Sequence, residues 1–257
     1  MGFFEEIGER IGIYWSSGRL ELTEDGVRFV MKNVFLYLLA LIIALKVYDV
    51  AAVGPEETKI GLSRVNVWFR NLWQYDGELG YSPFWYRFVQ ILGYASLAVC
   101  AFWSILFFWD MIQCGGLDGR GTDKNLAASF FLYVLAGLLC LLFKVLVVNC
   151  GPIIMQGNEK PAPSFPSFYT VIFILAWGSM MFHIADTFNW GSTISHIADL
   201  MGGPKRFVTI LHAVCTVIML TGIFAVLRSG INWFTDVLGA FLLSVTLLCF
   251  YTFFFDI

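Results

Sequence analysis

Residues 88–112 read FVQILGYASLAVCAFWSILFFWDMI, and Asp110 is the only charged side chain in this run. A helix needs about 20 consecutive apolar residues to cross the hydrocarbon core of a bilayer. Backbone polar groups inside lipid must also satisfy one another, which a helix achieves within its own segment. The run therefore predicts a transmembrane helix and decides the class of the fold.

Five further apolar segments have the same character. They span residues 34–53, 126–148, 168–184, 207–227 and 233–255. Together with 88–112 they predict an all-α polytopic membrane protein, a bundle of about six transmembrane helices. We expect an N-terminal cytoplasmic or interfacial segment, residues 1–29, followed by a six-helix transmembrane domain, residues 30–257.

The composition supports this class and excludes others. Of the 257 residues, 58% are hydrophobic and 14% are charged, whereas a soluble domain carries about 25% charged residues. The mean hydropathy is +0.74, so there is far too much apolar surface for a disordered chain. The net charge is −3 without a long basic run, which argues against nucleic acid as a partner.

Two segments outside the spans are amphipathic. Residues 60–73 set apolar side chains against Arg64 and Arg70 and predict a helix in the membrane interface. The polar N-terminal segment favours either a loosely ordered tail or an interfacial helix. The apolar face of that helix would comprise Phe3, Phe4, Ile7, Ile11 and Ile13. We expect no cleaved signal peptide, because the first long apolar run comes too late.

The distribution of Lys and Arg predicts the orientation. Six spans place both termini on one side. Eight basic residues fall on that side: Arg10, Arg19, Arg28, Lys32, Arg120, Lys124, Lys205 and Arg206. Six fall on the other: Lys59, Arg64, Arg70, Arg87, Lys160 and Arg228. The excess favours cytoplasmic termini.

The cysteines do not indicate a metal centre or a disulfide framework. The six are Cys100, Cys114, Cys140, Cys150, Cys215 and Cys249. None forms a Cys-x-x-Cys pair, and four lie in apolar runs where cysteine behaves as a small buried hydrophobe. We therefore expect neither a metal nor another cofactor.

Three polar segments interrupt the apolar pattern at the outer ends of the spans. The first, residues 144–152, reads KVLVVNCGP. The second, residues 163–170, reads PSFPSFYT. The third, residues 227–239, reads LRSGINWFTDVLG. Their order and their common side suggest that they meet in one site.

These segments resemble the three signature motifs of the type 2 phosphatidic acid phosphatase superfamily. The family patterns are Lys, six residues, Arg-Pro; Pro-Ser-Gly/Ser-His; and Ser-Arg, five residues, His, three residues, Asp. Residues 232–244, NWFTDVLGAFLLS, are similar to the bacterial wording HWFTDIIGGILLS. The resemblance implies a bundle in a bacterial cytoplasmic membrane that removes phosphate from lipid phosphates such as phosphatidic acid or undecaprenyl pyrophosphate.

The resemblance also implies a role for each motif position. In the family the Lys and two Arg hold the phosphate. The last His attacks phosphorus and is oriented by the Asp, and the middle His protonates the leaving group. Here Lys144, Pro152, Pro166, Ser167 and Asp236 are kept. The departures are Gly151 and Val226 at the Arg positions, Phe168-Tyr169 in place of Gly/Ser-His, and Asn232 at the nucleophile.

Other side chains offer poor replacements. The three His residues, His183, His196 and His212, fall away from the motif face and suit interhelical hydrogen bonds. Cys150 would need a strongly lowered pKa to act as a nucleophile. Arg228 lies two residues from the lost Arg position, about 200° around a helix, and can instead snorkel to lipid headgroups.

The retained residues also have purely structural interpretations. Lys144 can either snorkel or contact an anion, and Ser167 can cap the fourth span. Asp236 can be a first-turn carboxylate stabilised by its own helix N-terminus. For each of these three residues both interpretations stay open.

The leading hypothesis is a catalytically inactive pseudophosphatase that binds a membrane lipid, such as a phospholipid or isoprenoid lipid, or a membrane protein partner. The expected ligand-binding residues are Lys144, Gly151, Ser167, Phe168, Tyr169, Arg228, Asn232 and Asp236. The aromatic replacements favour a less anionic ligand. An active lipid phosphatase working through Cys150, Tyr169 or Asp236 is the main alternative. A lipid transporter or a structural subunit of a membrane complex is the third.

Overall fold

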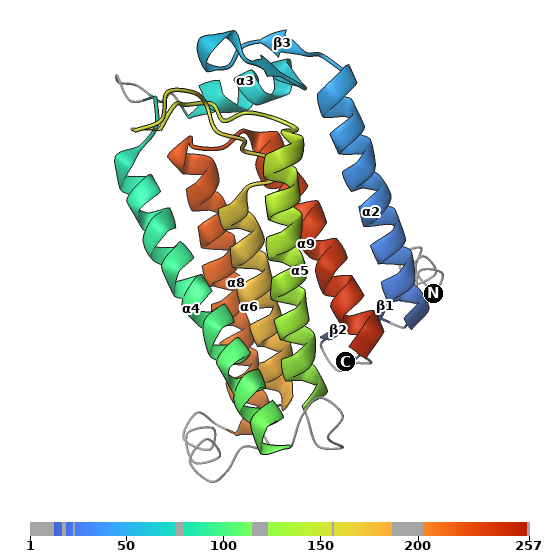
Figure 1. Cartoon of the computed structure of the whole chain (residues 1–257). Helices are drawn as coiled ribbons and strands as arrows, with labels where there is room; N and C mark the ends of the chain where they lie inside the picture. Colours follow the sequence, from blue (N-terminus) through green and yellow to red (C-terminus); the bar gives the residue numbers. More distant parts are fainter. Residues whose placement is uncertain are drawn as a thin grey trace.

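The computed structural model describes residues 13–16, 19–22, 24–73, 75, 80–114, 123–155, 157–186 and 203–255 (Figure 1). The helices are α2 (Glu24–Val47), α3 (Ser63–Leu72), α4 (Pro83–Gln113), α5 (Lys124–Leu146), α6 (Phe168–Asp186), α8 (Pro204–Ser229) and α9 (Phe234–Phe255). The short strands are β1 (Ile13–Ser16), β2 (Arg19–Leu22), β3 (Ala51–Ala52) and β4 (Lys59–Ile60), and a 3-10 turn covers Pro55–Glu57. The predicted all-α membrane fold is confirmed.

The apolar runs coincide with the long helices. Within the described residues, 5 helices are long and apolar enough to cross a membrane, namely α2, α4, α5, α8 and α9. The remaining predicted span, the fourth in chain order, corresponds to α6, whose apolar part, Phe168–His183, is shorter. Most of α6 is buried among the other helices, so a shorter apolar length suits its position.

The first span is displaced from its prediction of residues 34–53. Helix α2 begins ten residues earlier at Glu24 and ends at Val47. Glu24 and Asp25 occupy its first turn, where carboxylates interact favourably with the helix dipole. The apolar residues after Val47 instead enter the antiparallel β3–β4 pair. Gly54 and Pro55 lie between these strands and do not favour a continuing helix.

Outside the spans, the structure confirms a helix within the amphipathic segment 60–73 and places one residue of the proposed N-terminal helix face in a strand. Helix α3 falls inside the predicted segment 60–73, and its Trp68 and Leu72 side chains are exposed. Ile13, assigned to an interfacial helix face, instead begins β1, which pairs with β2 in an antiparallel hairpin. The other members of that face, Phe3, Phe4, Ile7 and Ile11, lie outside the described residues.

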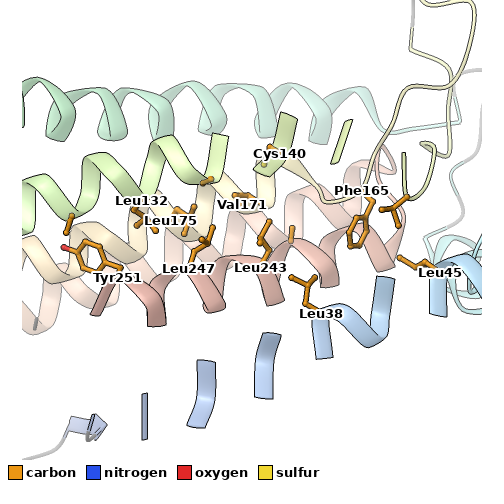
Figure 2. Close-up of a cluster of buried hydrophobic side chains, with 14 residues drawn as sticks. Leu38, Leu45, Leu132, Cys140, Phe165, Val171, Leu175, Leu243, Leu247 and Tyr251 are labelled. Atoms are coloured by element: carbon orange, nitrogen blue, oxygen red, sulfur yellow. The ribbon is translucent and has the colours of Figure 1, made fainter. Parts of the chain in front are cut away.

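Helix α6 occupies the middle of the bundle and contacts α4, α5, α8 and α9, while α2 packs along α9 at the periphery. A large apolar core lies between α5, α6, α9 and α2 (Figure 2). Phe165 and Leu45 lie at one end of this core, and Tyr251 lies at the other. Phe165 belongs to the loop before α6, so the core anchors the second motif segment.

Helix α2 begins and α9 ends at the same end of the bundle, and the motif segments lie at the opposite end (Figure 1). The observed helix ends change the charge count that predicted the orientation. Lys46 and Lys144 lie in the last turns of α2 and α5, at the motif end. Adding these two residues gives eight basic residues on each side. The charge distribution therefore favours neither orientation.

Candidate functional site

The three motif segments meet in a pocket of about 190 Å³ at the motif end of the bundle. Five of the eight predicted ligand-binding residues line it: Lys144, Gly151, Phe168, Tyr169 and Asn232. Tyr86 of α4 and Cys140 of α5 also contribute to the wall. Sequence reasoning missed these two because neither belongs to a motif. The pocket surface is mostly apolar.

Tyr169 is held between two helices. It projects from the first turn of α6, and its ring lies against Gly93 of α4. A Cβ atom at Gly93 would lie only 2.8 Å from Tyr169 Cε1. The absence of a side chain at position 93 therefore allows Tyr169 to reach its place in the wall. The position that carries His in the related motif is thus filled by a ring packed on a neighbouring helix.

Asn232 connects two motif segments. Its Oδ1 accepts a hydrogen bond from Ser167 Oγ at 3.2 Å, and its Nδ2 donates to the Ser164 carbonyl at 3.4 Å. The Ser167 backbone N–H also donates to the Asp236 carbonyl at 3.0 Å. Both ends of the Asn232 amide are therefore used to hold the second segment against the start of α9.

Ser167 immediately precedes α6, at the position expected for a cap. Its carbonyl accepts from the Val171 N–H at 3.1 Å, which begins the helix ladder. Its hydroxyl donates to Asn232, as above, and accepts from Thr170 Oγ1 at 3.1 Å. Ser167 is fully buried and does not line the pocket. Its hydroxyl thus lies behind the pocket wall and holds the lining residue Asn232 in place.

Asp236 is also buried behind the wall, with 0% of its surface exposed. Its Oδ2 accepts from the Trp233 N–H at 3.0 Å, the reciprocal half of a capping box at the start of α9. Among the described residues, its Oδ1 has no hydrogen-bond partner. The Asn149, Ser164 and Asn232 side chains lie near this carboxyl group. The contacts fit the first-turn structural interpretation of this aspartate.

The first segment is tied to the other two through its backbone. Cys150 forms an antiparallel bridge with Pro163, and the Gly151 N–H donates to the Ala162 carbonyl at 2.9 Å. The Trp233 indole N–H donates to the Cys150 carbonyl at 2.8 Å. A Cβ atom at Gly151 would meet neighbours no closer than 3.6 Å. The site therefore has room for the first atom of a side chain where the family has Arg.

Among the described residues, one cation lines the pocket, namely Lys144 in the last turn of α5. Arg228 does not reach it, because its guanidinium lies over the Trp73 ring, 5.3 Å from the centroid. Val226, at the other lost Arg position, is fully buried in the apolar core of α4, α6, α8 and α9. The pocket therefore lacks the ring of cations that the resemblance implies for a phosphate.

Arg70 is a structural residue that sequence reasoning did not single out. Its two terminal nitrogens donate to the Gly230 carbonyl at 3.0 Å and the Gly80 carbonyl at 2.5 Å. The guanidinium also lies over the rings of Tyr75 and Trp233, at 5.0 and 5.8 Å. The only sequence signal was its place on the polar face of the amphipathic segment. Arg70 thus joins α3 and residue 80 to the turn that carries Asn232.

Tyr75 supports the same turn from the outside. Its hydroxyl donates to the Leu227 carbonyl at 2.5 Å, and its ring packs on Gly230, which has a positive φ of 79°. Burial raises the pKa of the Tyr75 phenol to about 12, with the Arg70 and Arg228 charges opposing the change. The phenol is therefore protonated at neutral pH and available as a donor.

The alternative nucleophiles are badly placed. His183 is buried near the far end of α6, where its Nε2 lies 2.7 Å from Ser129 Oγ. His212 Nε2 lies 2.9 Å from the Met181 carbonyl, and His196 lies outside the described residues. Burial raises the pKa of the Cys150 thiol, despite the opposing Lys46 charge, and Cys150 does not line the pocket. Thiolate attack on a ligand there is therefore disfavoured.

No metal centre is evident in the part of the chain that the structure describes. No group of three or more His, Cys, Asp or Glu residues there could hold a metal ion. The polar side chains among the described lining residues are Lys144, the phenols of Tyr86 and Tyr169, the Cys140 thiol, the Ser164 hydroxyl and the Asn232 amide.

We expect Ser167→Ala to lower the free energy of unfolding by about 1–2 kcal/mol, because the half-buried Asn232 amide loses the hydrogen bond from the buried Ser167 hydroxyl. Thr246→Ala on α9 is the matched control, since its hydroxyl only bonds back to Leu242 of the same helix. Unfolding by SDS in mixed micelles measures both variants. Equal losses in the two would show that the Ser167–Asn232 contact contributes nothing of its own.

The comparisons with known proteins agree with this architecture. No protein family model and no curated protein matches the chain. Among solved structures, it is similar to the "first transmembrane PAP2 type phosphatidylglycerolphosphate phosphatase from Bacillus subtilis". The TM-score is 0.58 at 14% sequence identity, and the match covers 89% of this chain and 96% of the other. At this identity the similarity establishes the fold: the chain is a membrane protein with the architecture of a PAP2-type lipid phosphatase.

Proposed function

We propose that the protein is a non-catalytic, lipid-phosphatase-like membrane protein that binds a lipid headgroup at the motif pocket. The proposal rests on the motif position and the hydrogen bonds of Asn232. This residue stands where the resemblance implies the nucleophilic His, and both ends of its amide are engaged with Ser164 and Ser167. The pocket around it is nevertheless intact and accessible.

The chemistry of phosphoryl transfer supports this view. A phosphatase of this kind needs a nucleophile, a proton donor and cations around the phosphoryl oxygens. An amide is a poor nucleophile, and a phenol, with an ordinary pKa near 10, is a poor acid at neutral pH. Lys144 is the sole cation on the pocket wall within the part of the chain that the structure describes. All three requirements are thus weakened together.

The same wall favours a ligand with one negative charge. A phosphate monoester carries up to two charges at neutral pH and is matched by several cations in the related motif. Here Lys144 offers one charge, while Phe168, Ile153 and Met155 offer apolar contact. A phosphodiester headgroup, as in an anionic phospholipid, suits this balance better than phosphatidic acid.

The first experiment asks whether the protein releases phosphate. Purified protein in detergent is incubated with phosphatidic acid and with undecaprenyl pyrophosphate, and free phosphate is measured. We expect no release above a protein-free background. Release that disappears in Asp236→Ala or Tyr169→Phe would overturn the proposal in favour of an enzyme with substituted chemistry. Loss of release in Cys150→Ser would overturn it equally, whereas unchanged release in all three variants would point to a contaminating phosphatase.

The second experiment measures binding in nanodiscs by native mass spectrometry. We expect phosphatidylglycerol to be retained in preference to phosphatidic acid and phosphatidylcholine. Lys144→Gln should weaken its retention about fivefold, since a lysine near an anionic surface contributes about 1 kcal/mol. Lys124→Gln, at the opposite end of the same helix, is the control. No preference, or equal effects of the two variants, would contradict lipid binding at this pocket.

Two further points belong to this proposal. The motif resemblance supports a bacterial cytoplasmic membrane. The outward orientation of the motif end was predicted from the Lys and Arg count, which is even once the observed helix ends are used, so this orientation stays a prediction. Binding of a membrane protein partner and lipid transport are the other outcomes. Movement of labelled lipid between vesicle leaflets without phosphate release would favour transport over binding alone.

A further inference from the structure

A second hollow lies on the membrane-facing surface, away from the motif pocket. It has a volume of about 260 Å³, and the described residues that line it belong to α5 and α9. The α5 side chains are Ala128, Phe131, Leu132, Val134, Leu135 and Leu138, and those of α9 are Phe250 and Tyr251. We call this hollow the α5–α9 groove. We propose that it binds one hydrocarbon chain of a bilayer lipid.

The groove is open to the surroundings of the bundle. Phe131, Val134 and Leu138 expose 49%, 44% and 59% of their surfaces. Both helices that form the groove are long and apolar enough to cross a membrane. The groove therefore faces lipid tails, and its lining carries almost no polar surface.

The length of the groove matches one leaflet. Ala128 and Leu138 are ten residues apart, which is about 15 Å along a helix. Half of the ~30 Å hydrocarbon core of a bilayer is also about 15 Å. Ala128 lies four residues from the start of α5, and Phe250 lies five residues from the end of α9. The groove thus occupies the leaflet at the end opposite to the motif pocket.

The width of the groove decides between a lipid chain and a protein helix. A volume of about 260 Å³ along about 15 Å gives a mean cross-section of about 17 Å². A hydrocarbon chain about 4 Å across, from carbon contact distances, has a cross-section of about 13 Å². A helix about 10 Å across needs about 80 Å². The groove therefore matches the size of a single chain and is too small to enclose a helix.

The floor of the groove is held rigidly. Tyr251 is 1% exposed, and its hydroxyl lies 3.5 Å from Ser129 Oγ, which in turn lies 2.7 Å from His183 Nε2. Figure 2 shows Tyr251 and Leu132 toward the end of the core opposite to Phe165. The Tyr251 ring also packs on Phe182 of α6, with centroids 5.3 Å apart. Because these contacts fix the ring, the groove is formed before a ligand arrives.

Photolabelling tests the proposal. The protein is reconstituted in phosphatidylethanolamine–phosphatidylglycerol vesicles with a phospholipid that carries a diazirine in mid-chain, and adducts are mapped by mass spectrometry. We expect adducts to concentrate on Phe131, Leu135 and Leu138. The reference positions are Ile91, Ile105 and Ile112 of α4, which are exposed by 66–70%. The proposal would be overturned if the adduct yield at the groove and α4 positions depended only on the exposed fraction of each side chain.

A filled groove provides the matched variant. Leu135→Trp should remove the excess of groove adducts, whereas Leu142→Trp, on the exposed part of the same helix outside the groove, should leave it unchanged. Adducts between two protein copies at these positions would instead identify a second copy as the occupant. The adduct map of the wild-type protein tests the proposal even if a variant fails to fold. Lys144→Gln should not alter the groove adducts, so this test is separate from that of the motif pocket.

Discussion

Arg70→Ala is expected to lower the free energy of unfolding by about 3–4 kcal/mol, one of the largest single effects in the protein. The substitution removes two hydrogen bonds from a charged donor, each worth about 1.5–3 kcal/mol, and two cation–π contacts. It also leaves the Gly80 and Gly230 carbonyls without this donor. Burial lowers the pKa of Arg70 from its ordinary value, against the opposing effect of Tyr75, so the side chain sits in a partly desolvated place.

The control for Arg70 is on the same helix. Arg64 has 92% of its side chain exposed and a 3.6 Å ion pair with Asp49. Arg64→Ala should cost about 0–1 kcal/mol, as other surface ion pairs do. Arg70→Lys should give an intermediate loss, because an ammonium cannot reproduce the planar fork of donors. SDS unfolding in mixed micelles measures all three variants. A loss at Arg70 no larger than that at Arg64 would contradict its structural role.

The Arg70 variant should also weaken the motif pocket. Gly230 lies two residues before Asn232, and Arg70 holds this turn against α3. We therefore expect Arg70→Ala to reduce phosphatidylglycerol retention below that of Arg64→Ala at a temperature where both remain folded. Unchanged phosphatidylglycerol retention would mean that the turn carrying Asn232 keeps its position without the Arg70 hydrogen bonds.

Gly239→Ala is the second substitution with a large expected effect, about 2–3 kcal/mol of destabilisation. A Cβ atom there would lie 2.1 Å from Phe165 Cε2 and 2.5 Å from Cζ, so the ring must move. Phe165 is 2% exposed and packs on Phe143 with ring centroids 5.6 Å apart. Such overpacking typically costs about 1–3 kcal/mol. Displacing Phe165 also displaces the second motif segment.

The control and the coupling test for Gly239 are both available in this chain. Gly137 of α5 has nothing within 4 Å of an added Cβ, so Gly137→Ala should stabilise by up to about 1 kcal/mol through helix propensity. In a Phe165→Ala background, the cost of Gly239→Ala should vanish, because the clashing ring is gone. A double-mutant cycle measures this coupling. Strict additivity in the cycle would show that Phe165 does not cause the penalty.

Much of the fold was predictable from patterns within single segments. The apolar runs predicted five of the six spans closely because the bilayer imposes its length and polarity on each helix separately. The first span was misplaced because the apolar residues after Val47 are compatible with either a helix or a strand. They could extend α2, but they instead pair in β3 and β4 beyond it.

The site was predictable only in part. The motif spacing brought Lys144, Gly151, Tyr169 and Asn232 to one pocket, because each lies at the same end of its segment. It did not show which motif residues line the pocket and which only support the lining residues. Ser167 and Asp236 are buried behind the pocket wall. Arg228 lies over the Trp73 ring and not in the pocket. Helical rotation and packing partners determine which way a side chain points, and a motif pattern contains neither.

The sequence by itself determined that this is a polytopic helical membrane protein whose motif positions lack the expected His and Arg residues. Only the tertiary structure decided what replaces them. It shows Asn232 engaged by Ser164 and Ser167, and Arg70 holding the adjacent turn from a different helix. The physical reason is that spans obey the local demands of the bilayer, whereas a pocket depends on contacts between residues far apart in the chain.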